Sequence, residues 1–247
     1  MRLHKKFLLL PALAAVLALG FQAARKATPA EDPLIAGYKK ATIASVADAV
    51  DQVVGQRGYM NHDMRPYIPG QFAGRAATAL LKPAPPDKAI PALSAKHSVE
   101  MIDNAGPGEV GVIVIENGLD VAAMGGLMGT DAKARGLAGM VLDASVRDLA
   151  ELRALKLPVF ARGVVPSTTV SRFASVARGV PVECGGVTVK PGDIIVAGED
   201  GVVRVPQERA EEVLKRSQEI DERETKMVPF ILKHKSLQKV VELFNRI

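Results

Sequence analysis

The chain of 247 residues contains a single cysteine, Cys184. A lone cysteine forms no disulfide within its own chain, so the fold has to be stabilised by its hydrophobic core. Cys184 lies between apolar neighbours in the segment VPVECGGV. We therefore expect it to be a small packed residue rather than a nucleophile.

Histidine is also scarce, and His4, His62, His97 and His234 lie far apart in the chain. Their spacing offers neither a zinc cluster nor a Cys/His nucleophile pair. His62 and the adjacent Asp63 fall in a loop-like segment, where they either reach a site or are plain loop residues.

The sequence lacks a nucleotide-binding fingerprint. Neither of two glycine-containing turns, at Glu116–Gly118 and at Gly125, carries the pattern G-x-G-x-x-G, so no dinucleotide or S-adenosylmethionine loop is indicated. The net charge of +5 arises in residues 1–30, which contain five basic residues and no acidic one. Residues 31–247 are therefore formally neutral, and the pI of about 9.3 indicates no nucleic-acid partner.

Residues 1–30 resemble a targeting segment. A basic stretch, RLHKK, precedes the apolar run FLLLPALAAVLALGF, which is short for a membrane span and is interrupted by Pro11. This pattern favours a cleaved secretory signal over an uncleaved membrane anchor, with a small-x-small cleavage site at Ala18-Leu19-Gly20. We expect an exported protein, periplasmic or secreted, with anchoring as the alternative.

The remaining pattern predicts an α/β fold with one main domain over residues 31–206 and a helical arm over residues 207–247. The arm is expected to pack on the domain or on a neighbouring subunit. Helices are predicted at residues 34–54, 94–104, 149–155, 207–226 and 235–247. Strands are predicted at residues 72–81, 109–115, 138–144 and 157–161, and antiparallel strands within residues 180–206. Residues 55–71 are predicted to form a loop.

Some charged residues allow two interpretations. Asp193, Glu199 and Asp200 are metal ligands by type, but they lie in turns, and this context favours turn formers. Arg162 follows a predicted strand and either lines a pocket or lies on the surface.

The stretch from Gly125 to Glu151 concentrates the candidate chemistry. A glycine-rich turn opens a short helical pattern, AKARG, and an apolar strand, AGMVLDA, then delivers Arg147 and Asp148 at its end. Open α/β folds bind ligands at the carboxyl ends of their strands. In the helix that follows, Asp148 and Glu151 are three residues apart and share one face.

These residue types suit a hard cation that holds an anionic substrate. Mg²⁺ takes oxygen ligands and keeps several waters, and a guanidinium grips a carboxylate with two donors. Glycines let backbone N–H groups approach a ligand. Alone, an Arg-Asp pair is typical of a surface ion pair, and Gly-Gly before a helix is typical of a tight turn. Their joint spacing favours a site.

Twenty residues separate Gly126 from the pair Arg147-Asp148, and two more residues separate this pair from Glu151. This spacing resembles the signature G-x20-R-D-x2-E/D of the 4-hydroxy-4-methyl-2-oxoglutarate/4-carboxy-4-hydroxy-2-oxoadipate aldolases. These enzymes belong to the RraA-like superfamily. The segments TIASVADAVD, FAGRAATALL and residues 180–206 resemble the family's opening helix, first strand and closing sheet, so that the similarity covers about residues 35–247.

The resemblance implies a layered β/β/α domain with helical arms at both ends. It also implies a class II, metal-dependent pyruvate aldolase or an oxaloacetate decarboxylase acting on a small 2-oxo acid. Family members form trimers or pairs of trimers with the site at a subunit boundary, so we expect a homo-oligomer.

By the same resemblance, Asp148 binds Mg²⁺ or Mn²⁺ and Glu151 orients a metal-bound water. Arg147 and the backbone amides of Gly125, Gly126, Leu127 and Met128 hold the pyruvyl group. The metal acts as a Lewis acid, and a metal-bound water carries the proton, since the motif offers no lysine for a Schiff base.

Two alternatives stay open. One is a regulator like the RraA proteins that inhibit an endoribonuclease, although such members generally lack the acid at the Glu151 position. The other is an exported, non-catalytic carboxylate binder. Export is unexpected for a catabolic aldolase. The stretch LMGTD at residues 127–131 corresponds to a part of the sequence that varies among family members.

Overall fold

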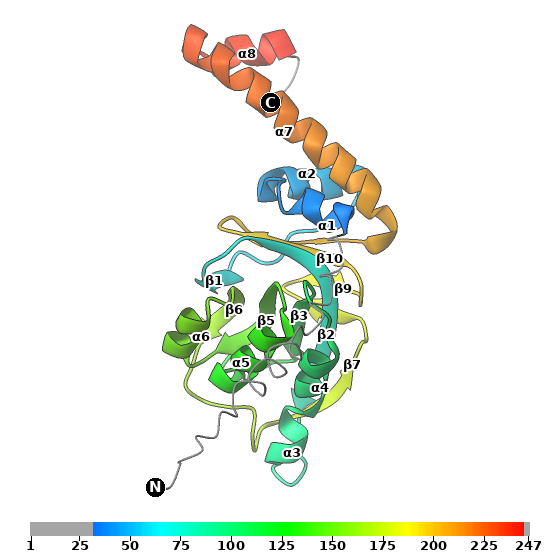
Figure 1. Ribbon diagram of the computed structural model, residues 1–247, viewed down its shortest axis with the longest axis vertical. Helices are drawn as coiled ribbons and strands as arrows, with labels where there is room; N and C mark the ends of the chain where they lie inside the picture. Colours follow the sequence, from blue (N-terminus) through cyan, green and yellow to red (C-terminus); the bar gives the residue numbers. More distant parts are fainter. Residues whose placement is uncertain (1–31, 245–247) are drawn as a thin grey trace, which may run out of the picture. The chain divides into compact units, whose positions relative to one another are not determined.

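A computed structural model describes residues 32–244 of the chain (Figure 1). The expected leader at residues 1–30 lies outside the described residues, as do residues 245–247 of the segment 235–247 that was predicted to be helical. Within the described part, none of the helices has the length and apolar character needed to span a membrane.

The elements follow one another as a helical N-terminal segment, an α/β core and a helical C-terminal segment. The helices are α1 (Pro33–Tyr38), α2 (Ile43–Val54), α3 (Pro91–Ser94), α4 (Lys96–Asn104), α5 (Gly126–Arg135), α6 (Leu149–Leu155), a 3-10 turn η1 (Gln207–Arg209), α7 (Ala210–His234) and α8 (Leu237–Phe244). The strands are β1 (Arg65–Ile68), β2 (Phe72–Pro83), β3 (Val110–Ile115), β4 (Ala122–Met124), β5 (Gly139–Val146), β6 (Val159–Val164), β7 (Phe173–Arg178), β8 (Val182–Cys184), β9 (Val187–Val189), β10 (Ile194–Gly198) and β11 (Gly201–Val205).

The centre of the fold is a mixed nine-stranded sheet with the order β1-β6-β5-β3-β2-β10-β11, to which β4 adds beside β5 and β7 beside β2. Strands β2, β3, β5 and β6 run parallel to one another, whereas β1, β7 and β10 join them antiparallel. The two central parallel strands, β3 and β5, are buried along almost their whole length, as expected for strands covered on both faces. The predicted α/β class is confirmed.

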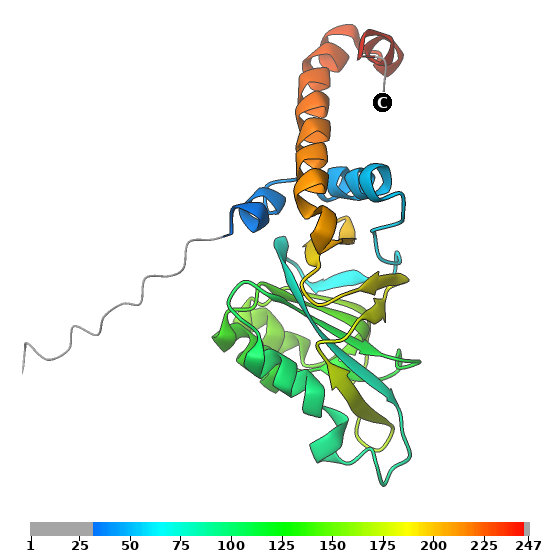
Figure 2. The same cartoon turned by 90° about the vertical axis from the view of Figure 1, so that its right-hand side faces the viewer.

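Helices cover the two ends of this sheet. Figures 1 and 2 show α4, α5 and α6 packed against the parallel strands, and α1, α2 and the start of α7 against the β10–β11 end. A core of apolar side chains lies under each group. The first includes Ile113, Met140, Leu142 and Leu152, and the second includes Val46, Val50, Ile194 and Val213.

The predicted helix at residues 34–54 is two helices. α1 ends at Tyr38 and α2 begins at Ile43, because Thr42 caps α2 by accepting a hydrogen bond from the Ser45 amide at 3.2 Å. Periodicity alone did not detect this cap.

Three strands were missed or misassigned. The predicted loop at residues 55–71 contains β1, which pairs with β6, and β4 and β7 were not predicted. All three lie at sheet edges or outside the main strand order, where partners rather than local pattern determine strand formation. In addition, α5 begins at Gly126 itself, with Gly125 as the extended residue before it, so the helix starts within the glycine pair rather than after it.

The C-terminal segment forms two helices, as predicted, and the first is longer than expected. α7 extends to His234 instead of Lys226, and α8 covers Leu237–Phe244. The Asp221 carboxylate on α7 accepts hydrogen bonds from the Thr42 and Ser45 hydroxyls at 2.8 and 2.7 Å, which ties α7 to the start of α2. Contact of this arm with a neighbouring subunit stays a prediction.

Candidate functional site

The site is formed where β5 ends and α6 begins. The buried strand β5 brings the chain to Arg147, whose amide donates to the Met124 carbonyl at 3.1 Å and so joins the ends of β4 and β5. Asp148 follows in the left-handed region, with φ of 58°, as the residue before α6. A non-glycine residue in this region is uncommon and is often found at functional sites.

The Asp148 carboxylate faces the beginning of α5. Its Oδ2 atom accepts a hydrogen bond from the Gly126 amide at 2.9 Å and lies 3.6 Å from Arg147 Nε. The N-terminal end of a helix attracts a negative charge, so α5 and Arg147 both draw the Asp148 carboxylate toward the start of the helix. The contacts hold Asp148 and Arg147 side by side at the helix end.

Two glycines allow the start of α5 to lie this close to the side chains of the β5–α6 junction. A Cβ atom on Gly125 would lie 2.3 Å from Asp148 Oδ2, and one on Gly126 would lie 1.7 Å from Glu151 Oε2. Contacts this short are not observed for real side chains. The pair Gly125-Gly126 therefore leaves the space that the side chains of Asp148, Arg147 and Glu151 occupy.

Several polar groups at this position remain available to a ligand. The amides of Leu127 and Met128, in the first turn of α5, donate to no acceptor within residues 32–244. The Glu151 carboxylate and Asp148 Oδ1 likewise have no protein partner in the described part of the chain. Arg147 and Asp148 have side chains that are 40% and 38% exposed, so both are accessible.

These groups surround one pocket of about 390 Å³. The structure brings all of the predicted site residues to it, although their roles stay predictions. The pocket is lined by Ala95, Ala122, Ala123, Met124, Gly125, Gly126, Leu127, Met128, Arg147, Asp148, Glu151, Thr168 and Thr169.

The sequence analysis missed the wall formed by Thr168 and Thr169. These residues reach the pocket because Thr168 forms a parallel bridge with Ala122, next to the glycine pair. No local signal in the segment VVPSTTVS marks this long-range pairing.

The oxygen donors of this pocket fit a hard divalent cation. Asp148 offers one unpaired carboxylate oxygen, and Glu151 offers an unpaired carboxylate nearby on α6. No group of three or more His, Cys, Asp or Glu side chains is placed to enclose an ion anywhere in residues 32–244. A cation here would therefore keep most of its waters, which is how Mg²⁺ is usually held.

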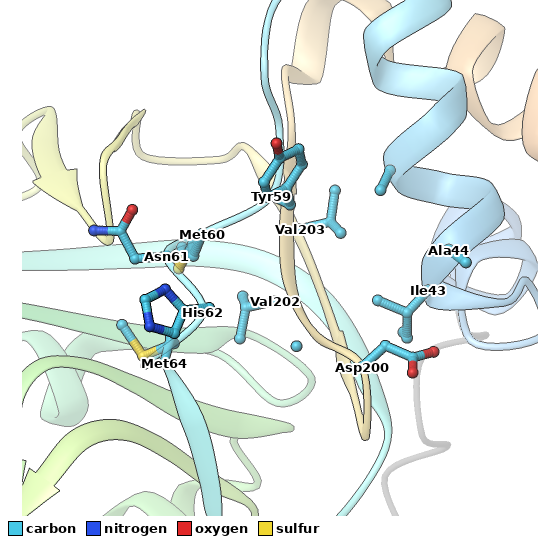
Figure 3. Close-up of a pocket in the computed structure, with 12 residues that line it drawn as sticks. Ile43, Ala44, Tyr59, Met60, Asn61, His62, Met64, Asp200, Val202 and Val203 are labelled. Carbon is cyan, nitrogen blue, oxygen red and sulfur yellow. The ribbon is translucent and has the colours of Figure 1, made fainter.

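A second pocket, of about 290 Å³, lies between α2, the segment 59–64 and the β10–β11 hairpin (Figure 3). Its walls are mainly apolar, including Ile43, Met60 and Val202, and His62 and Asp200 lie among its few polar groups. Among the described residues, neither a guanidinium group nor a set of free backbone amides lines this second pocket together with these polar groups. We therefore assign the candidate site to the pocket at Asp148 rather than to this one.

Other charged residues have structural partners. Arg162 donates to Asp63 and Asp143, each at 2.7 Å, and these carboxylates raise the pKa of its guanidinium against the opposing effect of burial. Arg162 therefore neither lines the candidate pocket nor lies free on the surface, and Asp63 does not reach the pocket either.

Asp193 and Cys184 are both buried inside the fold. The Asp193 carboxylate accepts hydrogen bonds from the Lys190 amide at 2.8 Å and from Arg204 at 2.7 Å, as expected for a turn former. Cys184 packs with its sulfur 3.8 Å from that of Met60, and burial raises the pKa of its thiol. The prediction that Cys184 is a packed residue is confirmed.

Comparison with known proteins gives consistent matches. The family model RraA-like, described as Aldolase/RraA, matches residues 43–204. An uncharacterized protein of Methanocaldococcus jannaschii is 37% identical over 134 residues, which is 54% of this chain and 64% of that protein. A Halalkalibacterium halodurans protein named "Putative 4-hydroxy-4-methyl-2-oxoglutarate aldolase" is 38% identical over 116 residues, 46% of this chain and 53% of that protein.

The chain thus spans between half and two thirds of the length of these two curated relatives. Among solved structures, an uncharacterized protein from Pseudomonas syringae pv. tomato superposes with a TM-score of 0.76 at 27% identity, covering 87% of this chain and 96% of that chain.

Proposed function

Because this chain belongs to the RraA-like family, Aldolase/RraA, we propose that it is a divalent-metal-dependent pyruvate aldolase acting on 4-hydroxy-2-oxo acids such as 4-hydroxy-4-methyl-2-oxoglutarate. In this reaction the 4-hydroxyl group loses its proton, the C3–C4 bond breaks, and C3 takes up a proton. For 4-hydroxy-4-methyl-2-oxoglutarate the products are two molecules of pyruvate.

The observation that carries the proposal is the convergence in one pocket of a cation, free backbone amides and two carboxylates that keep oxygens without a protein partner within residues 32–244. Arg147, the free amides of Leu127 and Met128, and the carboxylates of Asp148 and Glu151 all line it. Cations and amides suit the substrate carboxylate, whereas carboxylates suit a metal ion. Each of these groups can exchange a hydrogen bond to water for one to a ligand without first breaking a strong contact within the protein.

Each residue has a role in this proposal. Arg147 binds the carboxylate of the pyruvyl group, and the amides of Leu127 and Met128 orient it. The Gly126 amide already donates to Asp148, so it positions this carboxylate rather than the substrate. Asp148 would hold Mg²⁺ or Mn²⁺, which supplies Lewis acidity at the 2-oxo group.

Glu151 is proposed to orient water and hold a proton near C3. Its carboxylate is exposed and has no protein partner in the described part of the chain, so it is free to accept hydrogen bonds from water in the pocket. No lysine is among the described residues that line this pocket, and the proposed mechanism therefore uses no Schiff base.

The test is pyruvate release from 4-hydroxy-4-methyl-2-oxoglutarate by the protein lacking residues 1–30. We expect turnover that requires Mg²⁺ or Mn²⁺, stops with EDTA, and falls at least about 1,000-fold in Asp148→Ala and Arg147→Ala. Asp200→Ala, in the other pocket, is the matched control and keeps wild-type kinetics. Turnover insensitive to EDTA, or retained in both site variants, would overturn the proposal.

The same site is proposed to decarboxylate oxaloacetate, because loss of carbon dioxide leaves the same pyruvate enolate. The assay with oxaloacetate is run in parallel with the same variants. A carboxylate binder without catalysis would show metal-dependent affinity for pyruvate in calorimetry and no turnover of either substrate. An RraA-like regulator would retain its protein partner after loss of Arg147.

We also propose an exported location for the protein, on the basis of the sequence of residues 1–30. Fractionation of cells that express the full chain tests this. The expected result is a shortened protein in the periplasm or the medium. A full-length protein recovered with membranes would instead indicate an anchor.

A further inference from the structure

The pocket has a second wall that the proposed aldolase chemistry does not use. It is formed by Thr168 and Thr169, in the segment between β6 and β7, and faces the pocket shared by Arg147 and Asp148. The residues assigned to the pyruvyl group all come from α5 and from the β5–α6 junction. The threonine wall is thus left for the other half of the substrate.

The segment that carries these threonines is held by several contacts. The Ala122 amide donates to the Ser167 carbonyl at 3.1 Å, and Arg172 donates to the Ser167 hydroxyl at 2.6 Å. The Thr169 carbonyl accepts from the Phe173 amide at 2.8 Å. Such bracing gives a rigid position to side chains in a region without regular secondary structure.

The same segment contains a residue with a strained backbone conformation. Ser171 lies in the left-handed region with φ of 67°, and its amide donates to the Ala89 carbonyl at 2.7 Å. A serine in this conformation costs free energy and persists only when the surrounding contacts impose it. The contacts impose this turn two residues after Thr169 and so help to hold the backbone that carries Thr169.

The Thr169 hydroxyl itself has no partner. The residue is only 4% exposed, yet its Oγ1 atom forms no hydrogen bond within residues 32–244. The fully enclosed side-chain oxygens without a partner in that range are Asp63 Oδ1 and Ser98 Oγ, so Thr169 Oγ1 still reaches open space. Because Thr169 lines the pocket, that space is the pocket.

We infer that Thr169 is a specificity-determining residue whose hydroxyl donates a hydrogen bond to a carboxylate or hydroxyl oxygen in the second half of the substrate. This inference rests on the proposed function for its division of the substrate into halves. A buried donor without a protein partner favours a ligand that satisfies it, and it disfavours a ligand with a methyl group in that place.

The test compares two ligands that differ in their second half. Calorimetry with Mg²⁺ measures the Kd of pyruvate and of 2-oxoglutarate for the wild type, Thr169→Val and Thr169→Ser. Valine has the shape of threonine without the donor. We expect Thr169→Val to weaken 2-oxoglutarate binding about 5- to 20-fold and pyruvate binding less than 2-fold, because only the longer ligand reaches the threonine wall. Thr169→Ser keeps the donor and stays within about 3-fold of wild type.

A structural role for the hydroxyl is tested by the unfolding temperature. Since the hydroxyl has no protein partner, Thr169→Val should unfold at the wild-type temperature or slightly above it. A clear decrease in Tm, or equal weakening of both ligands, would overturn the inference.

The failure of each proposal has a different signature. If the wild type binds 2-oxoglutarate and Thr169→Val binds it equally well, the role of Thr169 is wrong and the proposed function is unaffected. If the wild type binds neither ligand, the proposed function loses its support, and the role of Thr169 is refuted together with it.

Discussion

Gly126 is a position where a neighbouring side chain determines the residue type. Its backbone is not in the left-handed region, and it begins a helix, so the backbone itself would accept alanine. The space for a Cβ atom is instead taken by the Glu151 carboxylate. The glycine is therefore needed for the site rather than for the helix.

Gly126→Ala should accordingly separate stability from activity. We expect an unfolding temperature within a few degrees of wild type, because alanine favours a helix, and a kcat/KM for pyruvate release reduced at least about 10-fold, because Glu151 is displaced. Thermal unfolding and steady-state kinetics measure the two quantities. Normal kinetics in a folded Gly126→Ala protein would contradict this explanation of the glycine at position 126.

Cys184 gives a second test at the scale of one residue. The side chain is fully buried beside Met60, and burial raises the pKa of the thiol, so little thiolate forms near neutral pH. We expect no reaction of the native protein with a thiol reagent such as DTNB at pH 8, and one equivalent after unfolding in guanidinium chloride. Rapid labelling of the folded chain would show that this region opens.

At the scale of elements, one carboxylate links two helices that are distant in the sequence. Asp221 on α7 accepts from both the Thr42 hydroxyl and the Thr42 amide, the latter at 3.2 Å, and from the Ser45 hydroxyl. Thr42 is also the cap of α2. The link therefore fixes the cap and the contact between the two helices together.

Removing this link should weaken the fold without altering the site. We expect Asp221→Ala to lower the free energy of unfolding by about 1–2 kcal/mol, since three hydrogen bonds to a charged acceptor are lost at a partly exposed position. Glu224→Ala, an exposed position on the same helix, is the control and should change it by less than about 0.5 kcal/mol. Urea unfolding measures both, and equal effects of the two variants would argue against a role for Asp221.

At the scale of the whole molecule, exposed apolar side chains support self-association. Leu127, at the mouth of the candidate pocket, is 91% exposed, and Leu232 and Leu243 in the C-terminal helices are 72% and 64% exposed. Apolar side chains gathered at a pocket rim and on an unsupported pair of helices are often covered by another chain. This agrees with the homo-oligomer that we expect from the family resemblance.

We expect light scattering to give a mass of three or six chains, each of 26.2 kDa with the leader present. Leu127→Glu should shift the protein toward the monomer, because a carboxylate is costly to bury at an interface. Lys133→Glu, on the same helix, serves as the control for added negative charge. A monomer at micromolar concentration would refute the oligomer proposal.

Much of the fold could be predicted because its elements are local. Strand β5 and helix α6 follow from an apolar run and from the residues after it, and the structure places them at Gly139–Val146 and Leu149–Leu155. The edge strand β1 could not be predicted, since its four residues become a strand only by pairing with β6. The break between α1 and α2 was missed because the cap at Thr42 is a single polar residue.

For the candidate site, the sequence by itself determined that Arg147, Asp148 and Glu151 lie together, because a strand end and the first turn of the next helix are close in space whatever surrounds them. It also placed Gly126 at the correct spacing. Only the tertiary structure decided that Gly126 donates to Asp148 and that Thr169 faces the same pocket. Those contacts depend on sheet pairing between segments far apart in the chain, which packing of the whole core determines and no local pattern encodes.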